Sequence, residues 1–287
     1  MTGFLSELGK KAAERWLALI VVPGLLLVAV VWASWTLRRH NVWFDPAPLR
    51  ADVRRWSGER AEALVLGAAG ALLAAAGAAQ LARGLSGAVE RLWFAAGLGG
   101  LGRRLTRRRA ERWQERDRAY ERALLAEPGG ADLDALLAAR DRICPVRPAR
   151  PTWMADRARA AGERVYLAYD LDLTSLWPRL WLIVPEAARN ELAAARTAVT
   201  ANARLFAWGV LYLVPALWWW PAALVAVVTG AVAWRRARAA TDVLADLAES
   251  AVDLYGPALA AQLGVAAPDG LTPAVGLAVT ERLRKDG

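Results

Sequence analysis

Trp16–Leu37 reads WLALIVVPGLLLVAVVWASWTL and contains no charged residue. A helix needs about 20 consecutive apolar residues to cross a hydrocarbon core about 30 Å thick, and this segment meets that length. Trp16 and Trp35 flank it, where tryptophan side chains favour the membrane interface. A cleaved signal peptide is the alternative, but its apolar region would be shorter and Ala33-Ser34-Trp35 is a poor cleavage site. The segment therefore predicts a first membrane-spanning helix.

Two further apolar stretches predict more spans. Ala61–Ala82 repeats small residues every four positions, among them Gly67 and Gly70, which we select as candidates for helix packing or oligomerisation in lipid. The alternative for this stretch is an alanine-rich helix buried in a soluble core. Leu205–Trp234 has no charge over its whole length and favours two short spans, with one kinked span as the alternative. We therefore expect an all-α integral membrane protein with about four transmembrane helices and a cytoplasmic helical region.

Arginine is distributed unevenly between the spans. Residues 83–204 carry 22 arginines against 15 carboxylates, and further arginines follow directly after Trp234. The positive-inside rule then places this region and both termini in the cytoplasm, and the protein as a multi-pass protein in the inner (plasma) membrane. Arg38–Arg60 disagrees, because its six arginines would face outward.

The same patterns divide the chain into four regions. No strand-like alternation interrupts them, which is typical of an all-α fold. The regions are an N-terminal two-span membrane region with an interfacial segment (1–102), a cytoplasmic helical region (103–190), a C-terminal membrane hairpin (191–234), and a cytoplasmic C-terminal helix and tail (235–287).

The amino-acid composition excludes several kinds of functional site. The 287 residues carry a formal net charge of +9 and include one cysteine and one histidine. A disulfide framework within the chain, a Cys-based zinc site and a multi-His metal site are therefore excluded. No residues stand out as catalytic, cofactor-binding or metal-binding, so we expect a protein that is not an enzyme and needs no cofactor.

Arg103–Leu125 predicts a strongly basic helix. Its candidates for contact with anionic lipid are Arg107, Arg108, Arg109 and Arg112. We interpret this segment first as a solvated helix and second as a helix that contacts lipid, and interleaved glutamates such as Glu111 disfavour nucleic acid. Gly97–Gly102 just before it matches G-x-G-x-x-G, but no strand precedes it, so we expect no dinucleotide site.

The C-terminal helix carries two patterns. A coiled-coil-like seam includes Leu244, Leu247 and Leu254, which we select as helix-packing or oligomer candidates. An acidic stripe lies on another face and consists of Asp242, Asp246, Glu249 and Asp253. We hypothesise that this stripe pairs with the basic helix within Arg103–Arg122, inside one chain or between two chains. A solvated acidic face is the alternative.

Tyr166–Arg189, YLAYDLDLTSLWPRLWLIVPEAAR, is the most distinctive segment. Trp177 and Trp181 would share a helix face if Pro178 opens a helix capped by Ser175 or Thr174, and with Arg179 they are candidates for the lipid interface or a packing seam. The segment resembles uncharacterised multi-pass membrane proteins of actinobacteria in its approach from tyrosine to aspartate, its WPRLW core, its Val-Pro-Glu step and its following Ala-Arg-rich helix. The resemblance covers about two thirds of the chain and implies a four-span plan without an established activity.

Three hypotheses for function remain at this point. The first is a non-enzymatic inner-membrane protein that assembles or scaffolds through its cytoplasmic helices. The alternative is a homo-oligomeric pore or membrane-perturbing effector gated by a cytoplasmic partner, and the second alternative is a small transporter. The partners we expect are membrane lipids, further copies of the chain and a cytoplasmic protein, whereas nucleic acid is not expected.

Overall fold

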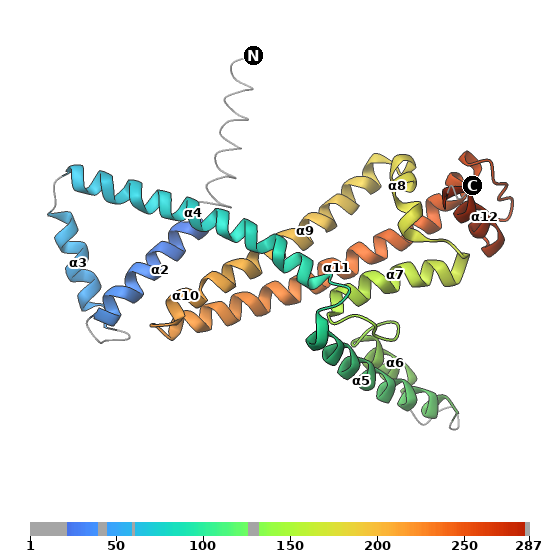
Figure 1. The fold of residues 1–287 in the computed structure, drawn as a ribbon, viewed down its shortest axis with the longest axis horizontal. Coiled ribbons are helices and arrows are strands. Elements are labelled where there is room, and N and C mark those ends of the chain that lie inside the picture. The colour runs from blue at the N-terminus through green and yellow to red at the C-terminus, as the bar shows by residue number, and fades with distance from the viewer. Residues whose placement is uncertain (1–21, 40–44, 59–60, 126–131, 285–287) are drawn as a thin grey trace, which may run out of the picture. The chain divides into compact units, whose positions relative to one another are not determined.

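The computed structural model describes residues 22–39, 45–58, 61–125 and 132–284, and every regular element in these ranges is a helix (Figure 1). The all-α prediction is therefore confirmed for the described part of the chain. The helices are α2 (Val22–Arg39), α3 (Ala47–Ser57), α4 (Ala61–Trp93), α5 (Gly99–Leu125), α6 (Leu133–Asp141), α7 (Trp153–Tyr169), α8 (Leu173–Ile183), α9 (Glu186–Leu211), α10 (Leu213–Ala216), α11 (Pro221–Gln262) and α12 (Pro273–Arg284). The first six residues of the predicted first span, 16–21, lie outside the described ranges.

The helices form two compact units, which we describe separately. Unit 1 comprises the described residues up to Val89 together with 201–235, and unit 2 comprises the described residues of 90–200 and 236–287. Three helices, α4, α9 and α11, contribute residues to both units. The predicted boundary between regions 1–102 and 103–190 lies inside α5. The boundary between the two units lies earlier in the chain, near the end of α4.

In unit 1, α2 packs on the small-residue face of α4. Gly24 of α2 lies so close to α4 that a Cβ atom on it would be 2.6 Å from the carbonyl oxygen of Ala75. Ala79 is buried in the same face, as expected where small residues let helices approach. Gly67 and Gly70 are exposed, and no neighbouring atom lies within 4 Å of a Cβ built on either. The chain thus uses only the second half of the predicted small-residue face for its own packing.

Residues 205–234 form the end of α9, the short helix α10 and the start of α11. After α10 the chain turns through Leu217–Trp220 and enters α11 at Pro221, which fits the first position of a helix because it lacks an N–H group. A Cβ atom on Gly209 of α9 would lie 3.2 Å from the backbone nitrogen of Gly230 in α11, so the two helices are in close contact. The stretch is therefore not one continuous helix, and the number of membrane spans in it stays a prediction.

Two helical stretches in the described ranges are long and apolar enough to cross a membrane. They are Ala61–Trp93 and Glu186–Ala216, and α2 is a shorter apolar helix. Only 11% of the apolar window of the first stretch and 28% of that of the second are buried. Most of the apolar surface of both stretches is therefore exposed.

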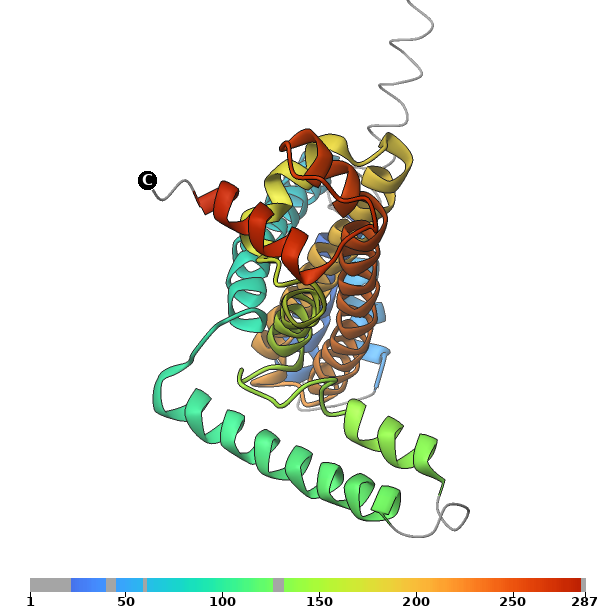
Figure 2. The ribbon, with the colours of Figure 1, turned by 90° about the vertical axis from the view of Figure 1, so that its right-hand side faces the viewer.

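Unit 2 has a core built from α7, α8, α9, α11 and α12. Leu176 and Leu180 of α8 are buried in it beside Leu192 of α9 and Val252 of α11. α12 packs against α7 and α8 (Figure 2). Gly276 makes this possible, because its backbone lies directly against the carbonyl oxygen of Tyr169 and leaves no room for a side chain.

The entry into α8 corrects one sequence prediction. The N-cap is Asp172, whose carboxylate accepts a hydrogen bond from the backbone N–H of Thr174 at 3.1 Å, and not Ser175 or Thr174. Pro178 therefore lies inside α8 and not in its first turn. The hydroxyl group of Ser175 also donates to Asp172, and this hydrogen bond is the main reason why the pKa of that carboxyl lies below its ordinary value.

A buried arginine joins α7 to α11. The side chain of Arg157 is 3% exposed, and its guanidinium group donates to Asp242 at 2.5 Å, to Glu249 at 3.1 Å and to Asp246. Arg164, about two turns further along the same face of α7, reaches Glu249 at 2.6 Å. A charge can be buried at moderate cost only where such partners surround it.

The acidic stripe therefore has a partner other than the one hypothesised from the sequence. Within the chain it binds α7, through Arg157, Arg164 and the hydroxyl group of Tyr169, which donates to Asp253 at 3.0 Å. The basic helix Arg103–Arg122 packs on α6 instead. The reason is that α7 places a buried cation, Arg157, against the acidic stripe. A charge pair with a buried partner contributes more to stability than a pair between two exposed side chains.

Replacing Arg157 by methionine should destabilise unit 2. The change leaves three carboxylates without their common partner, and we expect a loss of about 2–3 kcal/mol, below the usual cost of breaking a buried pair because Asp242 and Asp246 remain half exposed. Arg164→Met is the control and should cost less than about 1 kcal/mol, because that side chain is 42% exposed. Unfolding followed by tryptophan fluorescence measures both; equal losses would contradict the role of Arg157.

Alanine substitutions at two glycines should have opposite effects. Gly276→Ala forces a methyl group onto the carbonyl oxygen of Tyr169 and should cost about 1–3 kcal/mol or release α12 from α7. Gly162→Ala, inside α7, meets its nearest neighbouring atom only at 4.0 Å and should gain about 0.5–1 kcal/mol from helix propensity. Midpoints of thermal unfolding compare the two; a neutral Gly276→Ala would refute the close contact.

Candidate functional site

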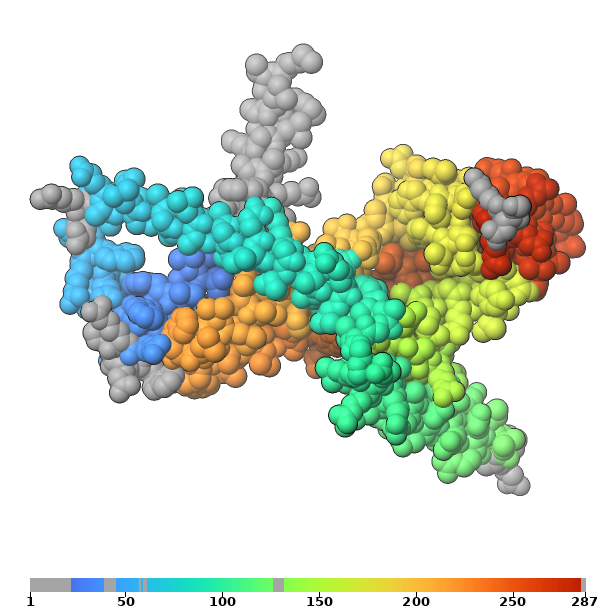
Figure 3. Space-filling view, in the orientation of Figure 1, coloured from blue at the N-terminus to red at the C-terminus, as the bar shows by residue number. Residues whose placement is uncertain are grey.

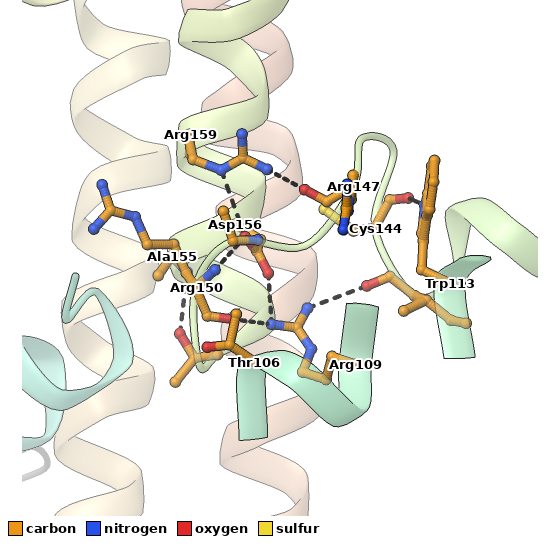
Figure 4. Close-up of polar contacts among 12 residues, drawn as sticks. Thr106, Arg109, Trp113, Cys144, Arg147, Arg150, Ala155, Asp156 and Arg159 are labelled. Atoms are coloured by element: carbon orange, nitrogen blue, oxygen red, sulfur yellow. Dashed lines mark hydrogen bonds and ion pairs between the residues drawn. The ribbon is translucent and has the colours of Figure 1, made fainter. Parts of the chain in front are cut away.

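The candidate site is organised around a carboxylate that has no exposed surface. Asp156, in the first turn of α7, accepts hydrogen bonds at Oδ1 from the backbone N–H groups of Ala149 at 2.9 Å and Arg150 at 2.8 Å (Figure 4). Its Oδ2 accepts from Arg109 Nη1 of α5 at 2.6 Å. Both oxygens are thus satisfied, as the burial of a charged group requires.

Arg109 ties α5 to the proline-rich segment that precedes α7. Besides Asp156, its guanidinium group donates to the carbonyl oxygens of Arg150 at 2.8 Å and Ile143 at 3.2 Å. We call this arrangement the Arg109–Asp156 clamp. Arg109 was a candidate for contact with anionic lipid, and in the structure its side chain is only 15% exposed and bonds to the buried carboxylate instead.

A second set of contacts holds the same segment. Trp113 Nε1 of α5 donates to the carbonyl oxygen of Cys144 at 2.8 Å. Cys144 is fully buried, and burial raises the pKa of its thiol above the ordinary value. Arg140 of α6 bonds to Asp117 at 3.1 Å and lies over the rings of Trp113 and Tyr120. The segment between α6 and α7 is therefore fixed from both sides.

Four arginines from three segments meet in a cavity of about 670 Å³ next to the clamp. Arg103 and Arg107 come from α5, Arg147 from the segment between α6 and α7, and Arg159 from α7. Gly97, Gly102 and one carboxylate, Glu163, also line it. We call this cavity the arginine pocket.

The four guanidinium groups differ in their partners. Arg159 pairs with Glu163 and donates to the carbonyl oxygen of Arg147, and Arg107 pairs with Glu111 at 2.9 Å on the exposed side of α5. Among the described residues, the guanidinium groups of Arg103 and Arg147 make no hydrogen bond or ion pair. The pocket thus combines two neutralised cations with two that are available.

The sequence pointed to one of these four arginines. Arg107 was a candidate, whereas the sequence analysis did not select Arg103, Arg147 or Arg159. The other candidates of α5 lie elsewhere: Arg108 is exposed, and Arg112 is exposed with its Nε 3.4 Å from the carbonyl oxygen of Arg108. Only the folded segment between α6 and α7 brings Arg147 and Arg159 to α5, so no local pattern could have identified them.

The WPRLW segment lines a separate, apolar groove of about 1050 Å³ in unit 2. Trp177 and Trp181 lie on one face of α8, with ring centroids 6.1 Å apart, and Leu192 of α9 and Leu244 of α11 lie opposite. Arg179 does not line the groove and donates to the carbonyl oxygen of Ser175 at 2.8 Å.

The remaining seam candidates on α11 divide between core and surface. Leu247 packs against the core of unit 2, whereas Leu254 is 69% exposed. Among the described residues, no group of three or more His, Cys, Asp or Glu side chains is arranged to hold a metal ion.

Comparisons with known families, curated proteins and solved structures found no match to this chain. The resemblance of the WPRLW segment to actinobacterial membrane proteins therefore stays a prediction. The arguments about function below depend on the geometry of the described residues alone.

The single cysteine should report on the Arg109–Asp156 clamp. In the intact protein, Cys144 should react with a thiol reagent at mild pH only through local opening, because it is buried and its pKa is raised. Arg109→Met leaves the carboxylate of Asp156 without its cation and should speed labelling by more than about tenfold. Arg108→Met, the exposed neighbour, should leave the rate unchanged. Identical rates in the two variants would refute the clamp.

Proposed function

We propose that this chain is a non-enzymatic protein of the inner membrane that assembles or scaffolds through its cytoplasmic helices. The observation that carries the proposal is the Arg109–Asp156 clamp, which holds a long and highly charged helix, α5, in a fixed position. A helix that is polar on all sides gains little from burial and needs other contacts to stay ordered. Here these contacts are the clamp, Trp113 and α6.

α5 offers the surface for a partner. Figure 3 shows α5 and α6 lying against each other, with much of α5 uncovered. The exposed residues on it include Arg104, Arg108, Arg112 and Arg116. A fixed row of cations lowers the entropic cost of binding and selects for an acidic partner surface by charge complementarity.

Unit 1 supports the membrane part of the proposal. Its apolar helices are α2, α4, the end of α9 with α10 and the start of α11. Two stretches, Ala61–Trp93 and Glu186–Ala216, are long and apolar enough to cross a bilayer, and the four-span plan is part of the proposal. Arg235 and Arg236 follow directly after the apolar part of α11, and under the positive-inside rule they favour the cytoplasmic side for unit 2.

The proposal is tested by the mass of the protein, extracted with its native lipids into nanodiscs from the cells that produce it. We expect a complex larger than one chain, and its loss on triple replacement of Arg104, Arg108 and Arg112 by glutamate, because reversed charges repel an acidic partner. The control is Arg282→Glu with Arg284→Glu on α12, which should keep the complex.

Two outcomes would contradict scaffolding. A single chain in every preparation would show that neither copies nor partners assemble on it. A closed ring of copies that releases ions from reconstituted vesicles would favour the pore hypothesis instead, because a scaffold carries no flux.

A further inference from the structure

We infer that the arginine pocket is a binding site for a phosphate-bearing anion. The inference is independent of the scaffolding proposal, because it concerns a concave site beside the clamp and not the exposed row on α5. The ligand chemistry is a phosphate group with more than one negative charge, as found in a soluble pyrophosphate compound or in the headgroup of an anionic lipid.

The charge balance of the pocket is the first argument. Four arginines line one cavity, and Glu111 and Glu163 neutralise Arg107 and Arg159. The charges of Arg103 and Arg147 therefore have no acidic partner among the described residues. Elsewhere in unit 2, buried arginines meet carboxylates directly, as Arg109 meets Asp156 and Arg157 meets three acids. Arg103, Arg107 and Arg147 are exposed, so solvent screens part of the repulsion among these cations, and a bound anion removes the rest.

The second argument is that the pocket is built before a ligand arrives. The Arg109–Asp156 clamp fixes the segment that carries Arg147 and the start of α7, and Arg159 is held by Glu163 and by the carbonyl oxygen of Arg147. The side chain of Arg159 is 21% exposed, and its Nε is buried without a hydrogen bond, 3.6 Å from Asp156 Oδ1. A preformed arrangement of donors binds with a smaller loss of entropy.

The backbone adds to this arrangement. Gly97 and Gly102 line the pocket on either side of Gly99, where α5 begins. Gly99 has a φ of +59°, a left-handed conformation that glycine adopts without strain, and it turns the chain into the helix. The N–H of Gly102 donates to the carbonyl oxygen of Leu98, so α5 contributes the partial positive charge of its N-terminal end, which acts in the same direction as the arginines.

Size and donor type favour phosphate over other anions. Guanidinium groups form paired hydrogen bonds with phosphate oxygens, and the available groups of Arg103 and Arg147 can each supply such a pair. A volume of about 670 Å³ accepts more than one phosphate group but does not accept a nucleic-acid duplex. Along α5 itself, Glu111 and Glu115 interrupt the row of arginines that a nucleic-acid backbone would follow.

The test compares two double variants of the full chain in nanodiscs of phosphatidylcholine. Arg103→Gln with Arg147→Gln removes the available cations of the pocket. Arg104→Gln with Arg108→Gln removes the same charge from exposed positions of α5 that do not line the pocket. Labelling of Cys144 must be equally slow in both, which verifies that the clamp is intact.

Calorimetric titration with inorganic pyrophosphate at constant ionic strength measures the affinity for a soluble ligand. A second set of nanodiscs contains a phosphoinositide, and native mass spectrometry counts the lipid molecules that stay bound. We expect the pocket variant to lose more than about tenfold in affinity or to lose the retained lipid, because each lost charge-assisted contact weakens binding by about that factor. The exposed variant should behave like the unchanged protein.

The outcomes separate the sources and can overturn the inference. Binding of pyrophosphate alone assigns a soluble ligand, and retention of the phosphoinositide that pyrophosphate displaces assigns a lipid headgroup. Equal losses in both variants would show a general effect of charge, and binding of neither probe would show an empty basic pocket. Binding of a single-stranded oligonucleotide that only the exposed variant weakens would assign nucleic acid to α5. Each of these last three results rejects the phosphate site.

Discussion

The carboxylate of Asp156 is fully buried, and much of unit 2 follows from the need to satisfy it. Two backbone N–H groups of the segment before α7 turn toward it, and Arg109 reaches it from α5. Without these donors the charge would cost several kcal/mol to bury. The same donors fold the segment between α6 and α7, seal Cys144 from solvent and bring Arg147 and Arg159 to one cavity. A structural ion pair thereby determines where the arginine pocket lies.

Arg157, the next residue in α7, carries a buried charge of the opposite sign and joins α7 to a different helix. Arg157 brings a buried cation to Asp242, Asp246 and Glu249 of α11, while Asp156 brings a buried anion to Arg109 of α5. Consecutive helical positions point about 100° apart, so one helix can serve two neighbours in this way. α7 therefore connects the basic helix to the helix that begins in unit 1, and the two pairs specify which neighbour lies on which side.

Apolar contacts alone would not give this arrangement. The core of unit 2 is built from leucine, valine and alanine on five helices, which could pack in several registers at similar cost. Charge pairs with defined geometry select one register, because a shifted helix would leave a buried charge without a partner. In unit 1 the selection is steric instead: Gly24 against Ala75 and Gly209 against Gly230 allow contacts that larger residues would prevent.

The sequence by itself determined the helical content of this chain, because apolar length and periodicity are local properties. It also determined the helices near 61–82 and 103–125 and, through the positions of its prolines, the turn near Trp218–Trp220. The acidic stripe was also visible locally, but its partner was not. With 37 basic and 28 acidic residues, many pairings are equivalent in sequence, and they differ only in how deeply each pair is buried. The partner of the stripe, the inward turn of Arg109 and the arginine pocket were therefore decided by the tertiary structure alone.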